Sequence, residues 1–313
     1  MHVSAGHQHY LWQGEWGEFP ESEVDSIRAT HSHHGVVVTE RGEVMTFHKG
    51  NPSVLVFDTD GNFKRLWCSD LSNAHDLALA KDGDTEYLWL ADNESGRVIK
   101  TTLDGETVMS LDRPDHPAYA DADYKPTSVT VNQSRFGGND DVWVTDGYGE
   151  SLIHRYDRKG SYLSTIDGQA GAAGRFNGPH GIWVDNRLPE PRLYVADRTS
   201  ARVQVYDLDG NYQREFGSDY MDSPSGFINV GDQLMIVEHR GARITVLDAD
   251  DKLVGYLGEN AGVNNTEGWP NNERGLHLPG KFNSPHGMAA DADGHLYVVE
   301  WLTGGRMTKL VAA

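Results

Sequence analysis

Four histidines recur at one position of an internal repeat, and their ring nitrogens are of the kind that binds transition metals. They are His34, His75, His180 and His286. Neutral imidazole is a good ligand for zinc, iron, manganese and cobalt, and nothing in the spacing chooses among these ions. Three such ligands with one open position are typical of catalytic zinc, which polarises a substrate oxygen or lowers the pKa of bound water.

The repeat that carries these histidines is a run of short β-strands. Its clearest copies begin with Pro-His-Gly at Pro179 and Pro285, and each continues into a second strand that ends in an acidic residue. Most copies add a third strand, a turn rich in Asp and Gly and a fourth strand, and Asp-Gly between apolar runs is a strong hairpin signal. The equivalent residues of the six copies are His34, His75, Thr127, His180, Ser225 and His286. Six such units predict an all-β fold, a six-bladed β-propeller with four antiparallel strands per blade. The repeated phrase resembles the NHL repeat, most clearly in blades 2, 4 and 6.

In a propeller, equivalent positions on the first strands form a ring around the central channel. We therefore expect His75, His180 and His286 to bind one metal ion, with His34 lining the channel rather than serving as a fourth ligand. The alternative is a stacked ring of structural histidines. An all-histidine set disfavours calcium as the primary metal, because calcium prefers oxygen ligands.

A second ring is expected where the second strand of each blade ends. It comprises His48, Asp92, Asp146, Asp197, Glu238 and Glu300. These side chains are expected to bind backbone amides between blades or to orient the histidines. The residues just beyond them differ from blade to blade and are expected at the channel mouth, where substrate chemistry usually lies. They are Lys49, Asn93, Tyr148, Arg198, His239, Arg240 and Trp301.

Composition excludes several classes of function. The 313 residues carry a formal charge of −20, which argues against binding to nucleic-acid phosphate or to an anionic membrane. Cys68 is the single cysteine, so no intrachain disulfide can form. No apolar stretch is long enough to span a membrane, and no secretory signal is recognised at the N-terminus. These features predict a cytoplasmic protein.

The domain organisation is expected to be one propeller over residues 1–313. An N-terminal strand is expected to complete the last blade, because the chain ends shortly after that blade's second strand. Residues 258–280 are rich in Gly, Asn and Pro without a strand pattern, which predicts an inserted loop. One closed ring requires no oligomer.

At these residues the sequence resembles the peptidyl-α-hydroxyglycine α-amidating lyases, six-bladed NHL propellers that complete peptide C-terminal amidation. The resemblance covers most of the chain and is closest from Pro126 to Phe216. It implies that His75, His180 and His286 are zinc ligands, that Tyr148 in Asp146-Gly147-Tyr148 is the catalytic tyrosine, and that Arg198 after Ala196-Asp197 is an active-site arginine. Lys49, in Phe47-His48-Lys49-Gly50, stands where the family has a second arginine.

The implied reaction cleaves the N–C bond of a carbinolamide to give an amide and glyoxylate. Zinc would hold the hydroxyl oxygen, and Tyr148 would take the hydroxyl proton as general base. Arg198, together with Lys49, would hold a carboxylate or stabilise oxyanion charge, although lysine lacks the bidentate geometry of arginine. Gly287 stands where the family has an aspartate associated with a structural calcium, and Ser284 stands where the family has a methionine. The resemblance therefore supports a metal-dependent lyase reaction more strongly than it supports a structural calcium or a peptide substrate.

Three functions remain open from the sequence. The first is a metal-dependent lyase acting on a peptide or on a small molecule such as an acylated or ureido α-hydroxyglycine. The second is a metal-dependent hydrolase or lactonase, in which metal-bound water attacks. The third is a non-catalytic NHL module that binds a partner on one face. Fold alone does not decide among them.

Overall fold

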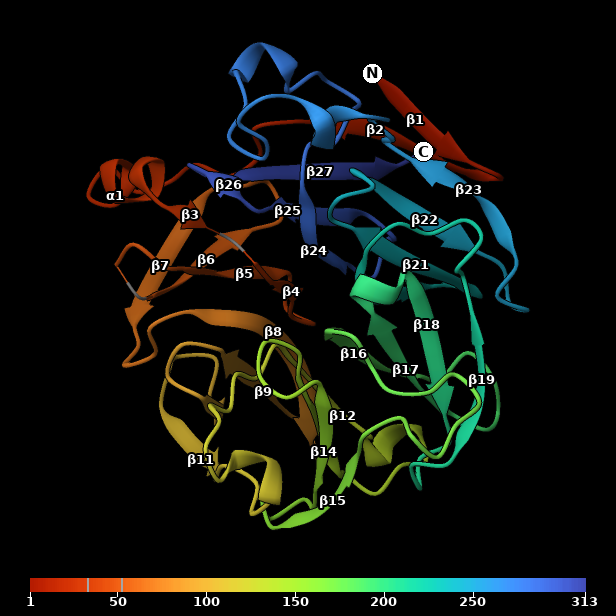
Figure 1. The fold of residues 1–313 in the computed structure, drawn as a ribbon. Coiled ribbons are helices and arrows are strands. Elements are labelled where there is room, and N and C mark those ends of the chain that lie inside the picture. The colour runs from red at the N-terminus through yellow and green to blue at the C-terminus, as the bar shows by residue number, and fades with distance from the viewer. Residues whose placement is uncertain (33, 52) are drawn as a thin grey trace. The chain divides into compact units, whose positions relative to one another are not determined.

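The computed structural model describes residues 1–32, 34–51 and 53–313, which form short strands with little helix (Figure 1). Within these residues there are six large sheets, five of four strands and one of five. They are the blades of a six-bladed β-propeller, and the predicted fold class is confirmed. The chain divides into two compact units, Leu71–Pro224 and Met1–Asp70 with Ser225–Ala313.

The unit Leu71–Pro224 holds blades 2, 3 and 4. Blade 2 consists of β8 (Ala74–Asp82), β9 (Thr85–Asp92), β10 (Arg97–Thr101) and β11 (Thr107–Leu111). Blade 3 consists of β12 (Ser128–Val131), β13 (Val142–Asp146), β14 (Leu152–Tyr156) and β15 (Tyr162–Ile166). Blade 4 consists of β16 (Pro179–Asp185), β17 (Arg192–Asp197), β18 (Arg202–Tyr206) and β19 (Tyr212–Phe216). Short 3₁₀ turns lie at η1 (Pro117–Tyr119), η2 (Ser134–Phe136) and η3 (Arg198–Ser200).

The other unit holds blades 1, 5 and 6. Blade 1 consists of β4 (Val36–Val38), β5 (Glu43–His48), β6 (Ser53–Asp58) and β7 (Phe63–Cys68). Blade 5 consists of β20 (Pro224–Val230), β21 (Gln233–Glu238), β22 (Arg243–Leu247) and β23 (Leu253–Leu257). Blade 6 consists of β24 (Pro285–Ala290), β25 (Leu296–Glu300), β27 (Arg306–Ala312), β2 (Gln8–Gln13) and β1 (His2–Ala5). The helix α1 (Val24–Ala29) and the strand pair β3 (His31–Ser32) and β26 (Leu302–Thr303) complete this unit.

Blade 6 combines strands from both ends of the chain. Three of its strands come from the C-terminal region, and β2 pairs antiparallel with β27, with Leu11 opposite Val311. Figure 1 shows the red β1 and β2 beside the blue β27. Tyr10 is fully buried, and the ring of Trp12 lies 4.7 Å from that of Phe282. The N-terminal strands therefore contribute to the hydrophobic core of this blade.

The Asp-Gly signals in the sequence correspond to the turns between third and fourth strands. In blade 4, the carboxylate of Asp207 accepts hydrogen bonds from the amides of Asp209 and Asn211, at 3.0 and 2.8 Å. Gly210 has a φ of +90°, a conformation that other residues rarely adopt. The aspartate and the glycine therefore fix the hairpin together.

Residues 258–280 form a long connection between β23 and β24. It contains two 3₁₀ turns, η4 (Val263–Asn265) and η5 (Arg274–Leu276). The indole of Trp269 donates to the carbonyl of Asn283 at 2.9 Å, and the side-chain oxygen of Asn271 accepts from the amide of Thr303 at 2.6 Å. These hydrogen bonds attach the connection to the segment that precedes β24 and to β26. None of the helices among the described residues has the length and apolar character needed to cross a bilayer.

Candidate active site

The phenol of Tyr148 lies between two of the predicted metal ligands. Tyr148 is on the turn after β13, and its oxygen lies 3.1 Å from Nε2 of His75 and 3.2 Å from Nε2 of His180. The two imidazole rings are 4.7 Å apart, and their exposed fractions are 2% and 3%. Blades 2, 3 and 4 therefore bring together one partly accessible phenol and two buried histidines whose Nε2 atoms converge on its oxygen.

The histidines stand at irregular points of their strands. The pairing register shifts between Ala74 and Asp76 in blade 2, between Pro179 and Ile182 in blade 4, and between Pro285 and Gly287 in blade 6. A bulge of this kind turns a side chain away from the alternation of a regular strand. The Pro-His-Gly phrases of blades 4 and 6, and Ala74-His75-Asp76 in blade 2, thus place an imidazole at the start of the first strand, outside the regular alternation.

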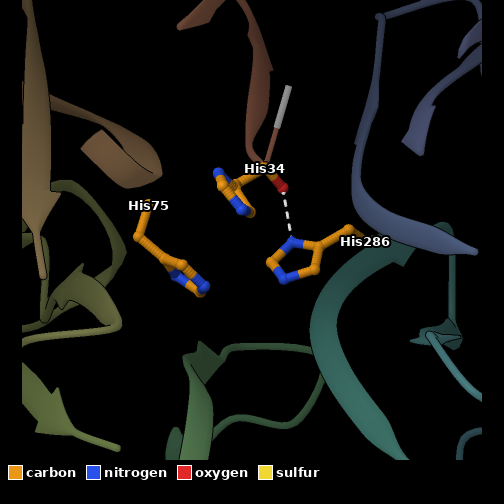
Figure 2. Close-up of side chains that lie close together, drawn as sticks. All are labelled: His34, His75 and His286. Atoms are coloured by element: carbon orange, nitrogen blue, oxygen red, sulfur yellow. Dashed lines mark hydrogen bonds between the residues drawn. The ribbon is translucent and has the colours of Figure 1, made fainter. Parts of the chain in front are cut away.

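Two of the predicted ligands have their tautomer fixed by the backbone. Nδ1 of His75 donates to the carbonyl of Thr127 at 2.7 Å, and Nδ1 of His286 donates to the carbonyl of His34 at 2.8 Å, a contact drawn in Figure 2. In both cases the carbonyl belongs to the equivalent residue of the next blade. Because a neutral imidazole carries one proton, Nε2 is left with its lone pair. This is the arrangement found in metal-binding histidines.

Arg198 contacts the same phenol. It follows β17 in the turn η3, and its Nη1 lies 3.3 Å from the oxygen of Tyr148. The guanidinium also lies over the tyrosine ring, 5.3 Å from its centre. Tyr148 is 39% exposed, so a substrate can reach it. A cation beside an accessible phenol can hold an anionic group of a substrate next to the hydroxyl.

The acidic residues at the ends of the second strands orient the segments that lead to the ring positions. Asp92, Asp146, Asp197 and Glu300 are fully buried. Each accepts a hydrogen bond from an amide two or three residues before the ring position of its own blade. These amides belong to Asn73, Lys125, Asn177 and Asn283, at 2.8, 2.7, 2.6 and 2.8 Å. In blades 2, 4 and 6, where the ring position is a histidine, the acid therefore acts on that histidine through the backbone.

His48 takes the corresponding place in blade 1 and packs against α1. Its Nε2 lies 3.3 Å from the hydroxyl of Ser26, and burial lowers its pKa. Lys49, the next residue, is half-buried, and its charge adds to burial in lowering the pKa of His31. Arg240, also predicted at the mouth, is exposed.

The remaining predicted residues gather in an aromatic cluster within the unit of blades 1, 5 and 6. The ring of His239 lies 5.9 Å from His286, 5.4 Å from Trp301 and 5.0 Å from Trp269. His34 lies 4.9 Å from His286 and 6.2 Å from Trp301. Trp269 comes from the connection 258–280, so this long segment contributes an aromatic ring beside His239.

Comparison with known proteins finds a distant relative that is named as an amidating lyase. No protein-family profile matches the chain. Peptidyl-alpha-hydroxyglycine alpha-amidating lyase 1 of Drosophila melanogaster is 26% identical over 228 residues, which cover 66% of this chain and 39% of that protein. The resemblance predicted from the sequence is confirmed by this match. The chain thus spans well under half of the length of this relative.

Solved structures agree on the fold. A streptogramin B lyase structure has a TM-score of 0.65 at 15% identity and covers 99% of this chain and 100% of its own. A catalytically inactive His-to-Ala variant of virginiamycin B lyase from Staphylococcus aureus, solved with quinupristin, has a TM-score of 0.59 at 14% identity, with 96% and 99% covered. A Bacteroides thetaiotaomicron protein of unknown function scores 0.69 at 14% identity, with 98% and 77% covered.

Several residues around the site escape sequence reasoning. The carbonyl of Thr127 fixes His75, but any residue type supplies a carbonyl. Asp76 accepts from the hydroxyl of Ser128 at 2.5 Å, and burial raises its pKa to about 6. Tyr119 and His154 form a hydrogen-bonded chain to Asp146, the first residue of the turn that carries Tyr148. The sequence signal for them is Leu152, which lies opposite Asp146 where blades 4, 5 and 6 have an arginine opposite the acid.

Proposed function

We propose that this protein is a metal-dependent lyase that cleaves the C–N bond of an α-hydroxyglycine-type carbinolamide. The proposal is carried by one observation, the phenol oxygen of Tyr148 within hydrogen-bond distance of His75, His180 and Arg198. The similarity to an amidating lyase supports the same reaction class. Metal dependence and substrate are part of the proposal.

The proposed metal ligands are the Nε2 atoms of His75, His180 and His286. His286 is included because it has the same repeat position as His75 and the same contact from Nδ1 to a backbone carbonyl. Three neutral nitrogen donors suit zinc or a neighbouring divalent ion such as iron, manganese or cobalt. When bound, such an ion supplies positive charge at the hydroxyl oxygen of the substrate.

The proton transfer is assigned to Tyr148. Its oxygen acts as the general base and takes the proton of the substrate hydroxyl. The C–O bond then becomes a carbonyl, the C–N bond breaks, and the electron pair of that bond goes to the amide nitrogen. Tyr148 returns the proton to this nitrogen, so that the products are a primary amide and glyoxylate. Atoms balance without water or any other reactant.

The cationic residues are assigned to the carboxylate of the substrate. Arg198 contacts Tyr148 and is half-buried, so its guanidinium can bind a carboxylate next to the reacting carbon. The resemblance adds Lys49 as a second cation. The substrate class is thus an N-acyl α-hydroxyglycine, either a small molecule or the end of a peptide.

Metal content and product identity test the proposal together. Wild type, His180→Ala and His9→Ala, a control at an exposed histidine, are purified and analysed by plasma mass spectrometry. One divalent transition-metal ion per chain is expected in wild type and in the control, and it is lost in His180→Ala. Wild type is expected to release glyoxylate from N-benzoyl-α-hydroxyglycine. Protein that takes up no metal on reconstitution, or loaded protein that forms no glyoxylate, would overturn the proposal. A hydrolytic product without glyoxylate would favour the hydrolase.

A further inference from the structure

The acid that ends the second strand is held differently in blade 3 than in blades 4, 5 and 6. In those three blades an arginine pairs with it: Arg202 with Asp197 at 2.7 Å, Arg243 with Glu238 at 3.1 Å, and Arg306 with Glu300 at 2.5 Å. Each arginine lies directly opposite its acid on the neighbouring strand. In blade 3 the residue opposite Asp146 is Leu152.

Asp146 is instead bound by the neutral side chain of Tyr119, which is bound in turn by His154. The phenol of Tyr119 donates to Oδ2 of Asp146 at 2.7 Å, and the same phenol oxygen lies 2.6 Å from Nε2 of His154. Nδ1 of His154 lies 2.9 Å from the hydroxyl of Thr165. Tyr119, His154 and Asp146 are all buried.

The protons of this network have one consistent arrangement. Burial lowers the pKa of His154 to about 3, so the imidazole is neutral and carries one proton. Tyr119 gives its only proton to the carboxylate, and its oxygen therefore accepts from Nε2 of His154. Nδ1 then accepts from the hydroxyl of Thr165. Every hydrogen bond points toward Asp146, and a fully satisfied buried network of this kind is rigid.

Asp146 is the first residue of the turn that carries Tyr148, and it holds the last residues of that turn and the segment before β12. Its carboxylate accepts from the amide of Glu150 at 2.7 Å and from the amide of Lys125 at 2.7 Å. Its carbonyl accepts from the amide of Ser151 at 3.1 Å. The turn 146–151 is therefore wrapped around this carboxylate, with Tyr148 at its centre.

We infer that Tyr119 and His154 are positioning residues for Tyr148. They orient the carboxylate of Asp146, and the carboxylate fixes the turn that presents the phenol to His75 and His180. In blade 3 this neutral pair takes the place that an arginine has in blades 4, 5 and 6. The inference rests on the proposed function, because it gives the turn the task of placing the general base.

The test combines exchange at the turn with kinetics. Tyr119→Phe removes the hydroxyl, and His154→Leu removes both ring nitrogens. His154→Gln is the conservative variant, because Gln204 occupies the equivalent place in blade 4 and donates to Asp197 at 3.2 Å. Tyr297→Phe is the matched control, since Tyr297 is also a buried phenol that donates to an aspartate, Asp291, at 3.0 Å.

Faster amide exchange at Glu150 and Lys125 is expected in Tyr119→Phe and His154→Leu. In the same two variants kcat should fall about tenfold, with KM and metal content unchanged. His154→Gln should recover most of kcat, and Tyr297→Phe should show neither effect. A mere loss of stability would lower kcat in the control as well.

The outcomes separate this inference from the proposed function. Unchanged exchange at Glu150 in Tyr119→Phe overturns the inference whether or not the protein is active. An equal loss of kcat in Tyr297→Phe also overturns it. If exchange rises in the two variants while wild type makes no glyoxylate, the role of Tyr119 and His154 in holding the turn stands and the proposed lyase reaction fails.

Discussion

His75 and Thr127 occupy the same repeat position in successive blades, and Nδ1 of His75 lies 2.7 Å from the carbonyl oxygen of Thr127. His286 makes the same contact with the carbonyl of His34 at 2.8 Å. The backbone of one blade thus sets the tautomer and ring orientation of the histidine in the preceding blade. Since a carbonyl is the acceptor, the ring position of the next blade can be threonine or histidine without changing this function.

Replacing His75 separates this structural contact from metal binding. The amide nitrogen of asparagine is placed like Nδ1, whereas leucine offers no donor. We expect His75→Leu to lower the free energy of unfolding by about 1–3 kcal/mol, because a buried carbonyl loses its partner. His75→Asn should lose much less, and both variants should lose the metal. Urea unfolding in the presence of a chelator, with metal analysis of untreated samples, checks this. Equal destabilisation by the two substitutions would contradict the role of Nδ1.

Removing the phenol hydroxyl of Tyr148 tests the assignment of the general base. Tyr148→Phe keeps the ring and its contact with Arg198 but removes the proton acceptor. The expected loss in kcat is about 10²- to 10⁴-fold, the range typical of general-base catalysis. Metal content should stay at the wild-type level, because the histidines are untouched. Glyoxylate formation at saturating substrate measures the effect, and a kcat within a factor of three of wild type would remove Tyr148 from the reaction.

The charge of Arg198 should matter only for substrates that carry a carboxylate. Arg198→Ala should raise KM for N-benzoyl-α-hydroxyglycine, and Arg198→Lys should raise it less, because lysine keeps the charge but loses the bidentate geometry. With the corresponding carboxamide as substrate, wild type and the two variants should have similar KM values. A variant that discriminates between carboxylate and carboxamide as strongly as wild type does would show that another group binds the carboxylate.

The N-terminal strands should be necessary for the stability of blade 6. Trp12 is 7% exposed, packs on Phe282 and lies on β2, which pairs with β27. Trp12→Ala is expected to cost about 3–5 kcal/mol, as for other large aromatic residues in cores. Leu11→Ala is the control on the same strand, because Leu11 is 37% exposed and should cost far less. Chemical denaturation compares the two, and similar costs would mean that β2 does not rely on this core.

The fold was predictable because its signals are local and repeated. Pro-His-Gly before a short apolar run and Asp-Gly before the fourth strand each recur along the chain, so a weak signal in one copy is reinforced by the others. The gathering of His75, His180, Tyr148 and Arg198 was predictable for the same reason, since equivalent positions of neighbouring blades lie close together.

Other parts of the site depend on contacts that residue types do not encode. The placement of His48 against Ser26 follows from where α1 packs, and no repeat specifies that helix. Tyr119 lies outside the repeated strands, so its contact with Asp146 could not be read from alignment of the blades. Leu152 was the one visible sign, because an arginine stands at the same place in blades 4, 5 and 6.

The buried imidazole of His154 should make stability depend on pH. Burial lowers its pKa to about 3 in the folded protein, whereas an unfolded histidine titrates near 6.5. Between these values the unfolded state binds a proton that the folded state does not, so stability is full above about pH 6.5 and falls as the pH decreases. From pH 7.5 to pH 5.5 this one residue should lower the free energy of unfolding of wild type by about 1.4 kcal/mol.

His154→Gln cannot be protonated at this position, so its free energy of unfolding should fall by about 1.4 kcal/mol less than that of wild type over the same interval. Taking the difference between the two proteins cancels the contributions of the other titratable groups. Urea unfolding at both pH values measures it, and parallel losses in wild type and variant would show that His154 is protonated in the folded state.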